Sequence, residues 1–587
     1  MHALELARRE CRAGLDLGRR TGLAPATVAT LTCGLGTALR QSGLPDEARP
    51  VLAEAEALAA TADASATRLA ALEGLGVIEE TGASKRMAIR YFEQAARLAA
   101  QAGDSVREIG LLNRLAVVAA SQLRFADAES FAHRALDIAA GLGDPEQAAR
   151  AIDGAKLVAW YLGDLDELER LAAGAEPRLR SDGEWYLQFV LLESAYVPAA
   201  RGQWTVADAR VEEGLALNDR IGNRAERPLL LALAARLDRW RGRLDTAWAR
   251  CVDACELVTR VGADWMLSWA RTELGALLLE LNEPGPAIDR LEEGRRVARA
   301  CHSSTVELWS VGHLCRATLR VGDERSAAAH VQEMADLIGL VTVPAGRAFL
   351  GAEDALAAYS EAALELGDPT PAHEVMEPLL EAADRAGHLP AHARASLVLA
   401  RADRTAGNVH QACRRLRHAR NSAEAGSLAV LSLDVVDALA EVTDGIERAE
   451  HLATAAGYRD ALRAHRLNGP PGGTRSPLVE SPVATVGDPD VVAARAGRAV
   501  DLVYQGWRTS SAHGAHRELT RRVALEEFEL AERSGGSSHK SAASQGPRIL
   551  EQVFTLVDSS AERDYREALV LDSGRDDFRA WSASFPR

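Results

Sequence analysis

Cys251 and Cys255 form the pair whose spacing best suits chemistry, since residues four apart share one face of a helix. Two thiolates placed in this way can supply half of a tetrahedral zinc site. No second Cys or His pair lies near them in the sequence, and neither a CxxC…CxxC nor an HExxH motif occurs. The sequence therefore favours the alternative, two small side chains buried in an alanine-rich helix seam, and we expect no metal site.

The lysines, the histidines and the last cysteine do not stand in recognisable catalytic motifs. A nucleotide-binding P-loop needs a lysine after a glycine-rich turn. The chain has only three lysines, Lys85, Lys156 and Lys540, and none stands in that frame. No cysteine follows Cys413, which excludes a caspase-like Cys–His dyad in residues 490–587, and no GxSxG motif occurs. His513 and His516 are more typical of a solvated loop than of catalysis. We expect no enzymatic activity, no cofactor and no ATP binding or hydrolysis.

The elements that carry these residues are expected to be helices. The chain has 587 residues, too many for one hydrophobic core, so it forms either several domains or an elongated array. Its apolar residues are mostly Ala and Leu, with 5% aromatics, which suits closely packed helices. The net charge of -16 repels nucleic acid and anionic lipid, so we expect neither as a partner of the repeat region.

The cysteines and the N-terminus bear on localisation. The seven cysteines are an odd number without framework spacing, which indicates reduced, intracellular thiols. The N-terminus is amphipathic and lacks an apolar signal region, and no apolar stretch approaches the roughly 20 residues that span a bilayer. We expect a soluble, cytoplasmic protein.

A turn recurs along the chain, usually as Gly followed five residues later by Ala. The first positions of the copies are 43, 83, 123, 163, 202, 242, 282, 322, 367, 407 and 444. The ten steps range from 37 to 45 residues and seven of them are 40, a regularity that chance does not produce. A second series in the opposite phase includes Gly103, Gly143, Gly183, Gly222, Gly262, Gly387 and Gly426.

Two turns per period leave two segments of about 16 residues, each with helical apolar spacing. Glycine suits the ends of these helices because it tolerates the left-handed C-terminal conformation. The repeating unit is therefore a helical hairpin. Stacked hairpins bury a continuous apolar face that one hairpin alone cannot. The sequence predicts an all-α, right-handed superhelical solenoid of about eleven hairpins between residues 23 and 466, with no β-sheet.

This unit resembles the tetratricopeptide repeat, with a small residue at the close-packing position and Asp/Glu-Ala after the turn. Because the unit is longer than the usual 34 residues, it is similar to the longer-helix variant in C-terminal sensor arms of bacterial signal-transduction ATPases. LuxR-type, maltose-activator-like and cyclase-linked regulators carry such arms. The stretches WYLGDLDEL, SWARTELGALLLELNEPGPAIDRLEEG and IERAEHLATAAGYRDAL carry the likeness.

Eight of the ten tryptophans lie between Trp160 and Trp309. Four of them, Trp185, Trp265, Trp269 and Trp309, fall in first helices of the predicted hairpins. In tetratricopeptide-like arrays, the resemblance implies, first helices line the concave groove. Aromatic anchors are frequent binding hot spots, so these four residues are the predicted partner site, with packing between repeats as the alternative.

The ends of the chain depart from the repeat. Residues 1–22 are expected to hold a partial repeat, the second helix of a hairpin, which indicates truncation, a misplaced start or an unusual cap. Residues 467–489 are rich in Pro, Gly and Ser and predict a linker. Residues 490–534 regain helical spacing, and residues 535–587 predict a flexible segment and an unassigned tail.

Two functions from different classes remain open. The first is a non-catalytic interaction scaffold, the sensing arm of a bacterial signalling or transcriptional regulator, whose groove binds a protein or peptide segment or a small effector. The second is the substrate-selecting repeat domain of an enzyme whose catalytic part lies in residues 490–587 or upstream. A DNA-binding helix pair in residues 490–534 is disfavoured because its charges nearly cancel.

Overall fold

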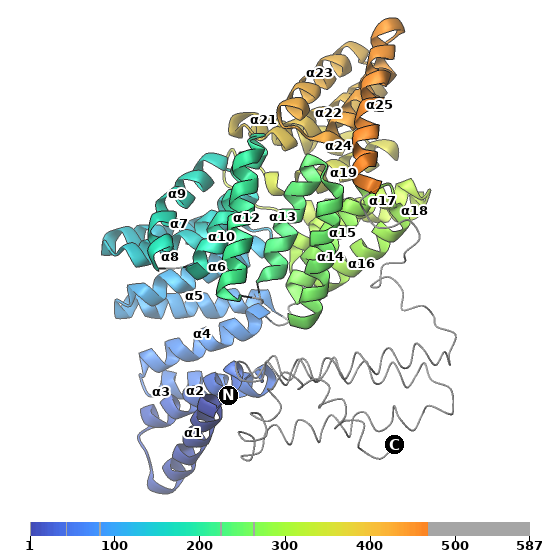
Figure 1. The fold of residues 1–587 in the computed structure, drawn as a ribbon. Coiled ribbons are helices and arrows are strands. Elements are labelled where there is room, and N and C mark those ends of the chain that lie inside the picture. The colour runs from blue at the N-terminus through green and yellow to red at the C-terminus, as the bar shows by residue number, and fades with distance from the viewer. Residues whose placement is uncertain are drawn as a thin grey trace, which may run out of the picture.

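A computed structural model describes residues 2–467, apart from residues 43, 82–83, 183, 224–225 and 262–263. The expected linker beyond Leu467, the helical segment 490–534, the tail 535–587, and His513 and His516 all lie outside the described residues. The described chain is an all-α solenoid, as predicted (Figure 1). Within it the only β-pairing is an isolated bridge between Arg124 and Thr342.

One helix and eleven hairpins follow one another along the described chain. The first six elements of the series are α1 (His2–Thr21), α2 (Pro25–Gln41) with α3 (Pro45–Thr61), α4 (Ser65–Thr81) with α5 (Lys85–Ala102), α6 (Ser105–Ser121) with α7 (Phe125–Leu142), α8 (Pro145–Leu162) with α9 (Leu165–Asp182), and α10 (Glu184–Ser194) and α11 (Tyr196–Ala200) with α12 (Trp204–Ile221). The later hairpins are α13 (Arg227–Arg241) with α14 (Leu244–Val261), α15 (Asp264–Glu280) with α16 (Pro284–Ala300), α17 (Ser304–Arg320) with α18 (Glu324–Ile338), η1 (Leu350–Ala352) and α19 (Glu353–Glu365) with α20 (Thr370–Glu374) and α21 (Met376–Ala386), α22 (Leu389–Thr405) with α23 (Val409–Ala425), and α24 (Ala429–Val442) with α25 (Gly445–Leu467). The eleven hairpins are called repeats one to eleven below, in chain order, so that α2 and α3 form repeat one and α24 and α25 form repeat eleven.

The turns between helices use the left-handed backbone conformation at the period read from the sequence. Glycine provides it at most positions, for example Gly163 with φ of 63° and Gly222 with φ of 66°. Where the series lacks glycine, Leu123 and Asn282 adopt the same conformation, each with φ of 62°. The backbone geometry therefore repeats even where the residue type does not.

The small residue five positions after the turn packs where two helices approach most closely. In repeats one to ten this position is buried, with at most 1% of its surface exposed. Its residues are Ala48, Ala88, Ala128, Leu168, Ala207, Ala247, Ala287, Ala327, Ala372 and Ala412. The corresponding Ala449 of repeat eleven is exposed, because no further described repeat packs on it.

The superhelix closes on itself, so that the first helices of repeats three to six contact those of repeats eight to eleven. Hydrogen bonds join residues more than 180 positions apart. These closing contacts are Thr305 Oγ1 to Ala120 O at 2.7 Å, Thr342 N to Leu123 O at 2.9 Å, Tyr196 Oη with His388 Nε2 at 2.7 Å, and Trp204 Nε1 to Gly426 O at 2.8 Å. Helix α1 and repeat one extend away from this closed body (Figure 1).

The 45-residue step in the period corresponds to an extra loop, residues 339–349, between α18 and η1. Its Thr342 pairs with the turn before α7, and its Arg347 forms an ion pair with Asp164. Phe349 packs its ring against Phe125, with centroids 4.6 Å apart. The insertion thus helps to close the superhelix.

Candidate functional site

A cavity of about 560 Å³ opens at one side of the closed body, where seven consecutive repeats, two to eight, converge. We call it the aromatic pocket. It lies at a place where small-molecule and peptide sites commonly occur, between helices, and its size suits such ligands. Its walls are Glu80, Lys85, Val117, Val118, Ser121, Asp153, Lys156, Leu157, Trp160, Tyr161, Phe189, Glu193, Glu226, Leu229, Leu233, Trp265, Trp269, Cys301, Ser303 and Val306.

Stacked indole rings form the base of the pocket. Trp269 lies against Trp309 with ring centroids 4.9 Å apart and against Trp160 at 5.8 Å. Tilted and edge-on arrangements of this kind are the favoured geometries for aromatic pairs. The Arg236 guanidinium lies 4.5 Å from the Trp309 ring centroid, a cation–π contact. Trp265 lies at the pocket with 38% of its surface exposed.

The four predicted tryptophans therefore occupy different environments. Trp265 and Trp269 both line the pocket, although Trp269 is only 5% exposed. Trp309 is 1% exposed and lies beneath the lining, where a partner has almost no access to it. Trp185 belongs to α10, but the position of its side chain lies outside what the structure describes.

The open groove expected around the four tryptophans is thus largely filled. The first helices that would line it, such as α13 and α17, are buried on nearly all sides. The physical reason is the closure of the superhelix, which brings opposite first helices into direct contact. The aromatic pocket is a part of the concave side that remains open.

Lys156 is the charged centre of the pocket. Its side chain is 2% exposed, forms an ion pair with Glu193 and has Asp153 Oδ1 at 3.3 Å. Burial lowers the pKa of Lys156, but the two carboxylates outweigh it, so the pKa is raised and the ammonium group stays protonated. A buried lysine is tolerated here because its charge is paired.

The other charged groups give the pocket an acidic excess. Lys85 donates a hydrogen bond to the Glu80 carbonyl oxygen, and burial lowers the pKa of Lys85. Burial also raises the pKa of Glu226. The lining holds the carboxyl groups of Glu80, Asp153, Glu193 and Glu226 against the amines of Lys85 and Lys156. With ordinary ionisation, four negative and two positive charges leave a balance of -2, of which Arg114, paired with Glu80 at 2.5 Å, offsets one charge.

An ion network behind the base holds the rings in place. Arg236 pairs with Glu273 at 2.6 Å, and Arg239 pairs with Asp354 at 2.5 Å and Glu280 at 2.8 Å. All five side chains are at most 6% exposed. A buried network with its charges paired fixes one arrangement of the helices, because any other leaves a charge without its partner.

The cysteine pair lies inside the solenoid and not on its surface. Cys251 and Cys255 are both buried on α14. Burial raises the pKa of Cys255 to about 11, which opposes formation of the thiolate that binds metal. Among the described residues, no group of three or more His, Cys, Asp and Glu side chains could hold a metal ion. No helix in the described part combines the length and apolarity needed to cross a bilayer.

Sequence reasoning did not single out Lys85 and Lys156 as site residues. The rarity of lysine could have indicated them, because the chain has only three lysines among 68 basic residues and two of the three line this pocket. Lysine carries a compact point charge, whereas the planar arginine fork needs more room.

No family model and no curated protein sequence matches the chain. Among solved structures, a Rap protein complexed with competence and sporulation factor is similar, with a TM-score of 0.43 and 11% identity over 61% of this chain and 98% of that chain. A signal-transduction ATPase with a tetratricopeptide repeat sensor from Pyrococcus horikoshii has a TM-score of 0.33 and 14% identity, over 60% of this chain and 54% of its own. The human IFIT1 dimer with PPP-AAAA has a TM-score of 0.34 and 14% identity, over 67% and 90%. At these values, what those proteins bind says nothing about the partner of this chain.

Proposed function

We propose that this chain is a non-catalytic interaction scaffold, the partner- or effector-sensing arm of a bacterial signalling or transcriptional regulator. The observation that carries the proposal is the aromatic pocket, whose walls come from seven consecutive repeats. A ligand bound there contacts all seven at once. Binding therefore changes the relative positions of repeats that are distant in the sequence, which is what a sensing arm requires.

The lining indicates the kind of group that binds. Trp265 offers exposed aromatic surface, Trp269 and Trp160 line the pocket with little exposure, and the carboxyl groups of the lining exceed the amines by two. Aromatic rings and carboxylates both attract cations. The preferred ligand therefore has an apolar body and a positive group, as in a peptide segment with a basic side chain or a small organic cation.

The test is capture of a partner by the full chain followed by measurement of affinity for its variants. Trp265→Ala should weaken binding about 30-fold or more, the effect of a hot-spot aromatic residue. Val206→Ala is the control, because Val206 is an exposed apolar residue on α12 that does not line the pocket. If the Trp265→Ala variant and the unchanged chain bound the partner with equal affinity, the partner site would not be the aromatic pocket.

A further inference from the structure

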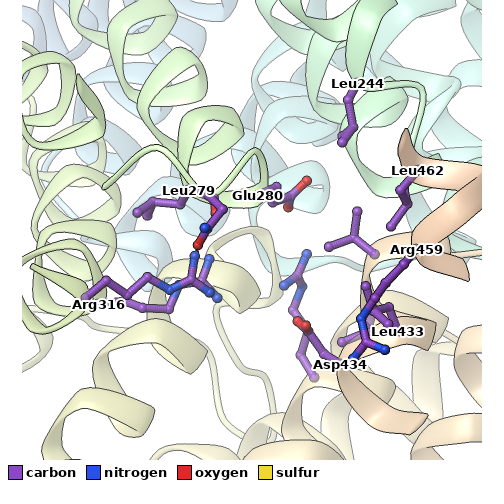
Figure 2. A pocket seen from close by; sticks show the side chains of 13 residues that line it. Leu244, Leu279, Glu280, Arg316, Leu433, Asp434, Arg459 and Leu462 are labelled. Carbon is purple, nitrogen blue, oxygen red and sulfur yellow. The ribbon is translucent and has the colours of Figure 1, made fainter. Parts of the chain in front are cut away.

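A second cavity, of about 360 Å³, lies where repeats six to eight meet repeats ten and eleven (Figure 2). It shares no lining residue with the aromatic pocket. Four arginines from three helices line it, Arg316 and Arg320 of α17, Arg394 of α22 and Arg459 of α25. We call it the arginine pocket.

The positive charge in this pocket exceeds the negative charge. Its lining carboxyl groups are those of Glu280 and Asp434, so four positive and two negative charges leave a balance of +2. The neighbouring pairs do not change this balance. Arg239, which pairs with Glu280, is offset by Asp437, which pairs with Arg459 at 2.5 Å.

Two of the guanidinium groups lack the partners that buried arginines normally have. Arg394 has no carboxylate within ion-pair distance among the described residues, and its Nε is buried without an acceptor. Arg316 has Glu361 only at 3.9 Å, and its Nε is also buried without an acceptor. Burying these two Nε atoms without an acceptor costs free energy, whereas the Arg316 side chain as a whole stays 19% exposed at the pocket.

The arginines of this pocket lie close enough to act on one another electrostatically. Burial lowers the pKa of Arg316, the carboxylates of Glu361 and Asp434 oppose this lowering, and the positive charges of Arg320 and Arg394 add to it. Arginine is rarely arranged in this way without an anion, because its fork of donors matches carboxylate and phosphate oxygens.

Apart from Asn282, the rest of the lining is aliphatic. Figure 2 shows Arg316 and Arg459 entering from opposite sides, with Leu244, Leu279, Leu433 and Leu462 around the same space. A bare inorganic anion would leave this aliphatic surface uncovered. The cavity volume lies within the range of small-molecule sites.

We propose that the arginine pocket binds a small organic anion, a carboxylate or phosphate group carried on a short aliphatic body. The anionic group lies among Arg316, Arg320 and Arg394, and the aliphatic body lies against the leucines of α14, α15, α24 and α25. A bound ligand thereby fastens the last hairpin to repeats six to eight.

The experiment is calorimetric titration of the full chain with hexanoate and with hexyl phosphate, whose headgroups distinguish carboxylate from phosphate recognition. Inorganic phosphate tests the headgroup alone, and hexylamine carries the same body with the opposite charge. We expect saturable binding of at least one of the two hexyl anions, weaker binding of inorganic phosphate and no binding of hexylamine. Affinity should fall as salt rises.

Arg394→Met should weaken binding at least tenfold, because it removes a charge-assisted contact and leaves the aliphatic stem. It should not impair folding, since Arg394 makes no ion pair in the described structure. Arg394→Lys should retain part of the affinity, and Arg325→Met, at an exposed arginine of α18, is the matched control. Absence of binding by both hexyl anions, equal affinity of the Arg394→Met variant, or equal binding of hexylamine would overturn the proposal.

Discussion

The tryptophans of the aromatic pocket separate at the residue scale into a packing residue and an accessible one. Trp309 is 1% exposed and contacts Trp269, Trp160 and Arg236. Trp309→Ala should lower the free energy of unfolding by about 3–5 kcal/mol, because it leaves a large cavity in the core. Trp265→Ala should lower it by about 1 kcal/mol or less, since 38% of that side chain is already exposed. Chemical denaturation of both variants measures the difference, and similar losses would assign Trp265 to the core.

Glu353 is a second residue whose burial has a measurable consequence. It is 1% exposed, and neither of its carboxylate oxygens accepts a hydrogen bond from another described residue. Burial, reinforced by Asp354, raises the pKa of Glu353 to about 7 from the model-compound value of 4.5. The folded chain therefore holds this proton over a pH range in which the unfolded chain has lost it. Stability that is present below pH 4.5 is lost as pH rises towards 7.

Glu353→Gln removes this titration while keeping the size of the side chain. The variant should gain about 2 kcal/mol relative to the unchanged chain between pH 5.5 and pH 8. Urea unfolding of both proteins at the two pH values checks it. Other titrations, such as those of His313 and His388, affect both proteins equally and cancel in the difference. A difference that does not depend on pH would show that Glu353 ionises normally.

At the scale of the helix and its turn, the sequence predicted most of the structure. The turn period placed the helix ends because the constraint is local: a residue must adopt the left-handed conformation, and a small one must follow five positions later. Even Leu123 and Asn282 satisfy the first requirement. Local constraints of this kind are readable from spacing alone.

The cost of this turn geometry can be isolated at Gly222. Its φ is 66°, and an added Cβ would meet no atom within 4 Å, so only backbone strain opposes a side chain there. Gly222→Ala should destabilise the chain by about 1 kcal/mol. Gly110→Ala should stabilise it by up to about 1 kcal/mol, because Gly110 lies inside α6 and is equally unobstructed. Thermal unfolding midpoints should therefore move in opposite directions, and a shift of the same sign in both variants would contradict this account.

At the scale of the whole molecule, the spacing of the turn residues was not sufficient to predict which helices contact one another across the superhelix. The first helices were expected to line an open groove, yet Trp309 is buried because α17 meets α6 and α8 across the superhelix. That meeting depends on the curvature summed over several repeats and on the insertion at residues 339–349. Neither quantity is set by the identity of a single residue, so no local pattern reports it. The arginine pocket escaped prediction for the same reason, since its arginines come from repeats eight, ten and eleven.

Gly202 offers a test of the closure. Its φ is 74°, close to that of Gly222, but it lies where repeat five meets repeat ten. An added Cβ would lie 2.5 Å from the Ala425 carbonyl oxygen and 3.1 Å from the Cα of Gly426. Backbone atoms cannot move aside as a flexible side chain can. Gly202→Ala should therefore cost about 1–3 kcal/mol more than Gly222→Ala, the usual penalty of overpacking.

The comparison of these two variants separates closure from turn strain, because both carry the same left-handed penalty. The added methyl group could separate the two repeats and leave the turn undistorted. In that case Trp204 Nε1 loses its hydrogen bond to Gly426 O, and repeats five and ten move apart. Small-angle scattering should then show a larger radius of gyration for Gly202→Ala than for Gly222→Ala. Equal stability and equal dimensions of the two variants would mean that the superhelix is open in solution. The concave face would then be accessible along its length, and the predicted partner groove along the first helices that carry the four tryptophans would be open.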